Sequence, residues 1–186
     1  MTTAQTQIPG YITGTWDIDP VHSDVSFTVR HMMVSKVRGR FTGFTGEITT
    51  GQDITASSVR AEVDATSIDT GNDQRDGHVR SADFFDVENH PRWGFTSTSV
   101  RADGDDLVVD GDLTIKGVTK PVSLALEVNG FGPDAFGGTR AGFTGTTTVN
   151  RSDFGVDIAM PLDGGGVVLG EKVQITLEIQ GVLRTA

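Results

Sequence analysis

The stretch SDVSFTVRH, residues 23 to 31, alternates apolar and polar side chains along its length. Val25, Phe27, Val29 and His31 fall on one face and the polar residues between them on the other, because successive side chains of a strand point to opposite sides. A period of two is typical of a strand with one buried face. The stretch therefore predicts a β-sheet protein with an apolar interior face.

The same alternation returns throughout the chain. It occurs at Val59, Ala61 and Val63, at Trp93 and Phe95, at Val122, Leu124, Leu126 and Val128, and at Val173, Ile175, Leu177 and Ile179. Turns rich in Gly, Asn and Asp separate these runs, and no parallel βαβ rhythm is present. We predict an antiparallel meander closed into a barrel, because closure removes exposed strand edges. A two-sheet sandwich is the alternative that alternation leaves open.

Length and composition indicate one globular domain. The chain has 186 residues, of which 36% are hydrophobic and 22% charged, as expected for a single β-domain. We expect residues 13 to 186 to form this domain and residues 1 to 12 to be a flexible amino-terminal segment. The sequence contains no cysteine, which excludes disulfides, thiolate nucleophiles and cysteine-ligated metals.

Charge and targeting signals restrict the partners. A formal net charge of -10 opposes binding to nucleic acid or to an anionic membrane, and a phosphorylated ligand would need a local cluster of cations. The first ten residues, MTTAQTQIPG, resemble no secretory signal, and no window approaches the roughly 20 apolar residues of a membrane span. We expect a cytoplasmic protein without stable membrane insertion. Its oligomeric state is left open, and a homodimer is possible.

One segment interrupts the alternation: RDGHVRSADFFDVENHP, residues 75 to 91. Helical spacing of its side chains predicts a short helix over about 72 to 82, near one end of the barrel, with Asn72 as a helix-starting residue. Phe84 and Phe85 follow and supply an apolar surface. We expect residues 72 to 86 to form a lid that gates one end of the barrel, with Phe84 and Phe85 plugging that end.

Five motifs occur in order along nearly the whole chain. They are WDIDPVHSDVSFTVRHMMVSKVRGRF (16 to 41), RDGHVRSADFFDVENHPRWGFTS (75 to 97), GDLTIKGVTKPV (111 to 122), NRSDFGV (150 to 156) and GEKVQITLEIQ (170 to 180). Together they resemble the YceI family of polyisoprenoid-binding, lipocalin-like bacterial proteins. The resemblance implies an eight-stranded antiparallel barrel around an elongated apolar pore. It also implies binding, storage or transport of a long-chain amphiphile, an isoprenoid or fatty-acid derivative, with no other cofactor.

Because side chains alternate between the two faces of a strand, a residue's position along the strand, its parity, shows whether it faces the interior of such a barrel. The inward candidates, followed by the two lid residues, are Phe27, Val29, Phe41, Trp93, Phe95, Phe84 and Phe85. Parity alone favours a core filled by these side chains, because the interior of an eight-stranded barrel is just wide enough for its own side chains to fill. The family resemblance favours a pore, in which the same residues contact the ligand.

Three polar residues are candidates for contact with the ligand's head group: His31, Arg75 and His78. His31 ends the apolar face of its strand, whereas Arg75 and His78 lie in the helical segment together with Arg80. Arginine binds oxyanions through paired N–H donors. Acidic residues outnumber the arginines between residues 72 and 90, which favours ion pairs within the segment as the use of Arg75 and Arg80.

Enzyme motifs are missing from the sequence. It has no G-x-S-x-G elbow and no HExxH helix, and its four histidines form no obvious metal cluster. We therefore expect no catalytic and no metal site. Two alternatives stay open: an enzyme that modifies the lipid through His22, His31 or Arg75, and a filled barrel that serves as a protein-interaction module.

Overall fold

The computed structural model describes residues 8–31, 35–82, 84–104, 106–156 and 169–185; of His31 and Leu169 it describes the backbone. The regular elements are β1 (Gly14–Ile18), β2 (Asp24–His31), β3 (Ser35–Phe41), β4 (Phe44–Thr50), β5 (Ser58–Asp64), β6 (Ile68–Asp69), α1 (Asp73–Arg80), β7 (Arg92–Asp103), β8 (Asp106–Ile115), β9 (Val118–Pro133), β10 (Thr139–Asn150) and β11 (Leu169–Leu183). Short 3-10 turns cover Ile54–Ala56, Ala65–Ser67 and Arg151–Phe154.

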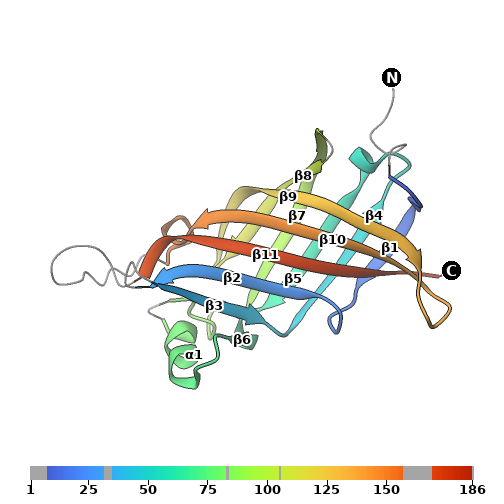
Figure 1. The fold of residues 1–186 in the computed structure, drawn as a ribbon. Helices are drawn as coiled ribbons and strands as arrows, with labels where there is room; N and C mark the ends of the chain where they lie inside the picture. Colours follow the sequence, from blue (N-terminus) through green and yellow to red (C-terminus); the bar gives the residue numbers. More distant parts are fainter. Residues whose placement is uncertain (1–7, 32–34, 83, 105, 157–168, 186) are drawn as a thin grey trace.

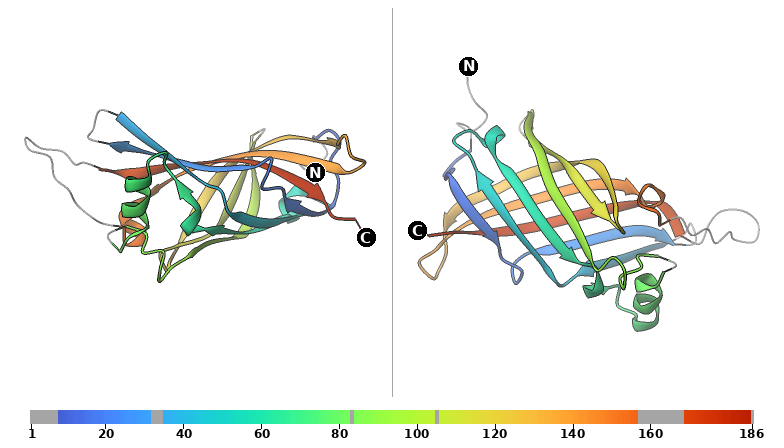
Figure 2. Two further views of the ribbon diagram at one scale, coloured as in Figure 1. Left: turned by 90° about the horizontal axis from the view of Figure 1, so that it is seen from below. Right: turned by 180° about the vertical axis from the view of Figure 1, so that it is seen from behind.

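Eight of the strands close into an antiparallel barrel (Figures 1 and 2). The ring runs β1-β4-β5-β7-β8-β9-β10-β11 and returns to β1. Strand β11 pairs with β10 along one edge and is long enough to pair with two strands along the other: Val173 lies opposite Val29 of β2, and Leu183 lies opposite Trp16 of β1. The predicted eight-stranded barrel is confirmed, and the sandwich alternative is wrong, because the sheet closes on itself.

The helix lies at one end of this barrel, beside β3 and β6 (Figure 1). Strand β3 pairs with β2 along its length and then with the two residues of β6, from which the chain turns into α1. The Asn72 side chain accepts a hydrogen bond from the backbone N–H of Arg75 at 2.9 Å, which caps the helix as predicted. The predicted short helix is thus confirmed, with bounds Asp73–Arg80.

Apolar side chains fill the opposite end of the barrel interior. Trp16 is completely buried there, and its indole N–H donates to the hydroxyl of Thr50 at 2.9 Å. Phe131 packs edge-on against Trp16, and Ile12 packs against the same cluster. The Tyr11 hydroxyl donates to the carbonyl of Gly51 at 2.6 Å. The described part of the amino-terminal segment therefore contacts the barrel, while the division at residue 12 stays a prediction.

A network around Arg140 joins two turns at this end. Its guanidinium donates to Asp19 at 2.7 Å and to Asp134 at 2.9 Å, and the side chains of Arg140 and Asp19 are only 22% and 14% exposed. The hydrogen bonds from Arg140 and then His22 hold the pKa of Asp19 well below its usual range. A carboxyl group with a lowered pKa stabilises the fold above its unfolded pKa of about 3.9, and this stabilisation is lost as the pH falls toward the folded pKa.

We therefore expect Arg140→Gln to reduce the acid sensitivity of the fold. The difference in unfolding free energy between pH 7 and pH 3 should shrink by up to about 1 kcal/mol, because Asp19 would lose the largest of the interactions that lower its pKa. Denaturant unfolding at both pH values measures this difference. The matched control is Arg92→Gln, whose guanidinium pairs with Glu62 at 3.4 Å on an exposed surface. An equal change in both variants would contradict a specific role for the Arg140 network.

Candidate binding cavity

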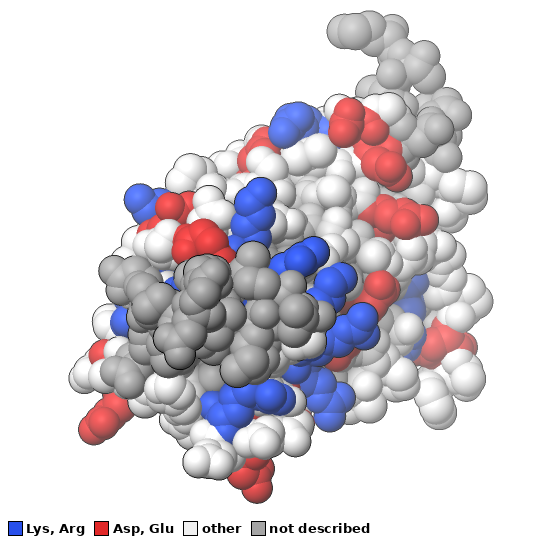
Figure 3. Space-filling view, turned by 60° about the vertical axis from the view of Figure 1, so that its left-hand side comes forward, with Lys and Arg blue, Asp and Glu red and all other residues white. Residues whose placement is uncertain are grey.

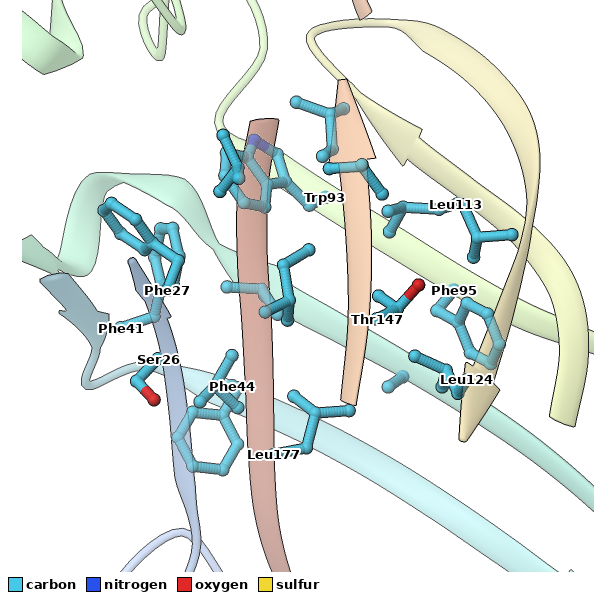
Figure 4. Close-up of a pocket in the computed structure, with 18 of the residues that line it drawn as sticks. Ser26, Phe27, Phe41, Phe44, Trp93, Phe95, Leu113, Leu124, Thr147 and Leu177 are labelled. Carbon is cyan, nitrogen blue, oxygen red and sulfur yellow. The ribbon is translucent and has the colours of Figure 1, made fainter. Parts of the chain in front are cut away.

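The barrel encloses a cavity of about 650 Å³. Side chains from nearly every strand line it, and most of them are apolar (Figure 4). Its volume lies within the range of roughly 300–1,000 Å³ that is usual for ligand pockets. The interior is therefore filled at the Trp16 end but left open along its middle, in contrast to the filled core that strand parity alone favours.

The alternating residues predicted to face inward do so. Along β2, β5, β9 and β11 the cavity is lined by Val25, Phe27, Val29, Val59, Ala61, Val63, Val122, Leu124, Leu126, Val173, Ile175, Leu177 and Ile179. Of the predicted site residues, the following also line it: Phe41, Arg75, His78, Phe84, Phe85, Trp93 and Phe95. The side chain of His31 lies outside the described residues. That these residues contact a ligand stays a prediction.

A chain of aromatic contacts runs from the cavity wall toward the segment after α1. Phe27 packs against Phe41 with ring centroids 5.8 Å apart, Phe41 against Trp93 at 4.7 Å, and Trp93 against Phe85 at 4.8 Å. The Phe27 ring lies directly over Gly39, where an added Cβ would be 2.3 Å from the ring. Any side chain at position 39 would therefore collide with this ring.

The segment around α1 is tied to the barrel by polar contacts. The buried carboxylate of Asp76 accepts hydrogen bonds from the backbone N–H of Thr70, at 2.8 Å, and from its hydroxyl. Phe84 is buried against the ring of His78, with centroids 4.9 Å apart. The backbone N–H of Phe85 donates to the carbonyl of Val79 at 3.1 Å. Both phenylalanines are therefore held against the end of the cavity that α1 covers.

The two arginines of this segment bond to the chain that precedes them. Arg75 donates to the hydroxyl and the carbonyl of Thr70 at 2.8 and 2.6 Å, and Arg80 donates to the carbonyls of Thr66 and Ile68 at 3.0 and 2.9 Å. In the described part of the chain neither guanidinium forms an ion pair, while Asp83, one of the acids of the segment, lies outside the described residues, so ion pairing within the segment stays a prediction. These bonds form because α1 packs beside the turn into β6, which presents carbonyl oxygens toward it.

Sequence reasoning missed several lining residues. Arg151 lines the cavity although it is 9% exposed, and it donates to the carbonyls of Gly170 at 2.9 Å and Val156 at 2.7 Å. It follows β10 in a 3-10 turn, where strand parity gives no direction. Along β10, Thr147 also lines the cavity, and its inward neighbour Gly145 is buried. These small or polar residues hide the alternation from a search for apolar side chains.

A cluster of cations lies on the outer face of the barrel wall. Arg30 and Lys36 lie opposite each other on β2 and β3, and Arg38 and Arg40 follow on the same outward face. All four are exposed, and Figure 3 shows Lys and Arg gathered on this side of the molecule. Residues that alternate with them, such as Val29 and Phe41, line the cavity instead. The cluster is therefore separated from the cavity by the wall itself.

Two further features bear on the class of protein. Among residues 8–31, 35–82, 84–104, 106–156 and 169–185, no group of three or more His, Asp or Glu side chains is placed to hold a metal ion. Within the same ranges, no helix has both the length and the apolar character needed to cross a membrane.

The chain is similar to known bacterial proteins. A family model described as a YceI-like domain matches residues 16–181. A UPF0312 protein of Shewanella baltica is 39% identical over 168 residues, which cover 89% of this chain and 85% of that protein. Protein YceI of Escherichia coli is 38% identical over 167 residues, covering 89% and 84% of the two chains.

Two solved structures share the fold. BcnA of Burkholderia cenocepacia superposes with a TM-score of 0.76 at 23% identity, over 88% of this chain and 98% of its own. A polyisoprenoid binding domain from Saccharophagus degradans superposes with a TM-score of 0.69 at 16% identity, over 93% of this chain and 100% of its own. Both likenesses concern the barrel. With the family model matched over most of its length, the chain belongs to the YceI family.

Proposed function

We propose that this protein binds a long-chain amphiphilic lipid, an isoprenoid or fatty-acid derivative, inside the barrel, and that it stores or transports this lipid. The observation that carries the proposal is the apolar cavity of about 650 Å³, which lies between the Trp16 cluster and α1. Each methylene that leaves water for such a cavity contributes roughly 0.8 kcal/mol, so a long tail supplies affinity by itself. The Saccharophagus domain that shares this barrel is described as polyisoprenoid-binding, which supports the same class of ligand here.

An enzyme is the less favoured alternative. His22 is exposed and hydrogen-bonded to Asp19 at 2.7 Å, and it does not line the cavity. Arg75 does line it, but its guanidinium is bonded to Thr70. Neither residue is thus placed as an activated acid or base beside a lipid in the cavity. A purely protein-interacting module is disfavoured by the cavity itself, which a filled barrel would lack.

Organic extraction of freshly purified protein, followed by mass spectrometry, tests the proposal. One long-chain amphiphile per barrel is the expected result. A processed product alongside its precursor would favour the enzyme, and extracts that stay empty after incubation with isoprenoid and fatty lipids would favour the interaction module. Extraction from a variant with a blocked cavity, described in the Discussion, separates cavity-bound lipid from lipid adsorbed to the surface.

We expect the segment that carries Phe84 and Phe85 to gate lipid exchange. Replacing both by alanine removes the two rings held at the α1 end, so the exchange rate of a fluorescent lipid should rise about tenfold or more. Stopped-flow transfer to acceptor vesicles measures that rate. The matched control is Phe136→Ala, since Phe136 is 87% exposed in the turn between β9 and β10. Unchanged exchange in a double variant that unfolds readily would show that the rings belong only to the core.

A further inference from the structure

The cluster of cations on the outer face of β2 and β3 is a local excess of positive charge on an acidic protein. The chain has 25 acidic residues against 15 Lys and Arg. Arg30 nevertheless lies directly opposite Lys36 across the two strands, with Arg38 and Arg40 following on β3, and Lys172 is exposed on the neighbouring strand β11 (Figure 3). The excess lies near the end of the barrel that α1 covers, because β3 pairs with β6, from which the chain turns into α1.

Most cations of the cluster have no acidic partner. In the part of the chain that the structure describes, Arg30, Lys36 and Arg38 form no ion pair, and Arg40 approaches Asp69 only to 3.9 Å. Like charges placed directly opposite each other on adjacent strands destabilise a sheet. The fold thus holds Arg30 against Lys36 at a cost to its own stability, as expected of a surface whose charges serve binding.

The surroundings of the cluster indicate which partner it fits. The residue opposite Arg38 is the neutral Thr28. Among the described residues, the exposed large apolar side chains are Val21 and Phe136, which lie in the turns β1–β2 and β9–β10 at the opposite end of the barrel. Protein interfaces centre on apolar or aromatic anchors, and single-stranded nucleic acid stacks on aromatic rings. The surface of an anionic bilayer needs neither, because it attracts Lys and Arg by charge alone.

The acidic balance of the whole chain does not prevent such docking. Charges farther apart than the Debye length, roughly 8–10 Å at physiological ionic strength, are largely screened from each other. On this wall of the barrel the acids Asp24 and Glu178 lie opposite each other at the far ends of their strands. Asp24 is about 20 Å from Arg30 along β2, at roughly 3.3 Å per residue. A membrane in contact with the cluster therefore senses the cations more than the acids.

We propose that the cation cluster docks this protein on the surface of an anionic phospholipid bilayer, without insertion, and thereby brings the α1 end of the barrel to the membrane. The inward side chains of the same two strands, such as Val29 and Phe41, line the cavity. Lipid then passes between the cavity and the bilayer through the segment that carries Phe84 and Phe85. The inference goes beyond lipid binding, because docking itself needs no lipid in the cavity.

Sedimentation with lipid vesicles tests the docking. The wild type should bind vesicles of equal parts phosphatidylglycerol and phosphatidylcholine, far more tightly than vesicles of phosphatidylcholine alone, and added salt should weaken this binding. Each Lys or Arg near an anionic surface strengthens binding roughly fivefold, so Arg30→Gln/Lys36→Gln/Arg38→Gln should bind the anionic vesicles about 100-fold more weakly. Unfolding of this triple variant should need no less denaturant than the wild type, because the opposed like charges are gone.

The matched control is Arg60→Gln/Arg92→Gln/Lys120→Gln, which replaces three exposed cations of β5, β7 and β9. It removes the same charge from the chain and should keep the binding to anionic vesicles. Equal binding of both vesicle types by the wild type, or an equal loss in the two triple variants, would overturn the docking. Binding of duplex DNA but of no vesicle would overturn it too and assign the cluster to nucleic acid.

A titration in solution keeps this result separate from the proposed function. Both triple variants should bind a fluorescent fatty lipid as tightly as the wild type does, because the cluster lies outside the cavity wall. Failure of all three proteins to bind that lipid or an isoprenoid would overturn the proposed function, whereas the vesicle measurement would still decide the docking.

Discussion

Leu177→Trp is expected to lower the affinity for a long-chain lipid about 100-fold while leaving the unfolding free energy of the ligand-free barrel within about 1 kcal/mol of the wild type. Leu177 points into the middle of the cavity from β11, and its partner on β10 is Gly145, which brings no side chain. A larger ring therefore has room to lie across the cavity. Displacing about four methylenes of the ligand costs roughly 3 kcal/mol, which is about 100-fold in affinity.

The control for Leu177→Trp is a substitution on the same strand. Gln174 is exposed on the outward face of β11, so Gln174→Trp adds the same ring outside the cavity and should leave lipid binding unchanged. Titration of a fluorescent lipid measures affinity in both variants, and denaturant unfolding measures stability. Wild-type affinity in a folded Leu177→Trp protein would show that the lipid does not occupy the cavity.

Alternation predicted the strands and their inward faces because it reports a local property. Val25, Phe27 and Val29 each face inward, as their spacing requires, since neighbouring side chains of a strand point to opposite sides whatever the rest of the barrel does. The helix was also predictable, because Asn72 caps it through a contact only three residues long. The strands and α1 thus depend on signals within single segments, whereas closure depends on the long-range pairing of β1 with β11.

The cavity was not predictable in the same way. Parity shows that Phe95 faces inward, but whether a space remains depends on what the opposite strands contribute. Ala61, Gly145 and Thr147 are small inward residues on β5 and β10, and they leave room that no single strand reveals. The family resemblance, rather than the period of two, predicted the pore.

Partners of the charged side chains were missed for a related reason. The acids near Arg75 and Arg80 suggested ion pairs, yet both guanidinium groups donate to backbone carbonyls before the helix. Composition cannot show how α1 lies against the turn into β6.

Phe95→Ala and Trp16→Ala are expected to affect stability very differently, although both remove a large inward aromatic ring. Trp16 is completely buried in the filled cluster and bonded to Thr50, so its truncation leaves a new cavity and should cost about 3–5 kcal/mol of unfolding free energy. Phe95 lies over Gly111 on one side and lines the existing cavity. Its truncation widens that space, so the ligand-free protein should lose only about 1–2 kcal/mol.

The stabilisation that bound lipid gives should depend on the ring of Phe95 and not on that of Trp16. A ligand that binds only the folded state raises stability according to its affinity, so losing the contact with Phe95 should reduce the stabilisation that lipid gives. Trp16→Ala, if folded, should keep that stabilisation, because its ring lies in the filled end. Denaturant unfolding of the three proteins, each with and without an isoprenoid or fatty lipid, measures both effects. A loss of 3–5 kcal/mol in ligand-free Phe95→Ala, with no response to lipid in any of the proteins, would mean that the ring is part of a solid core and that the barrel carries no lipid.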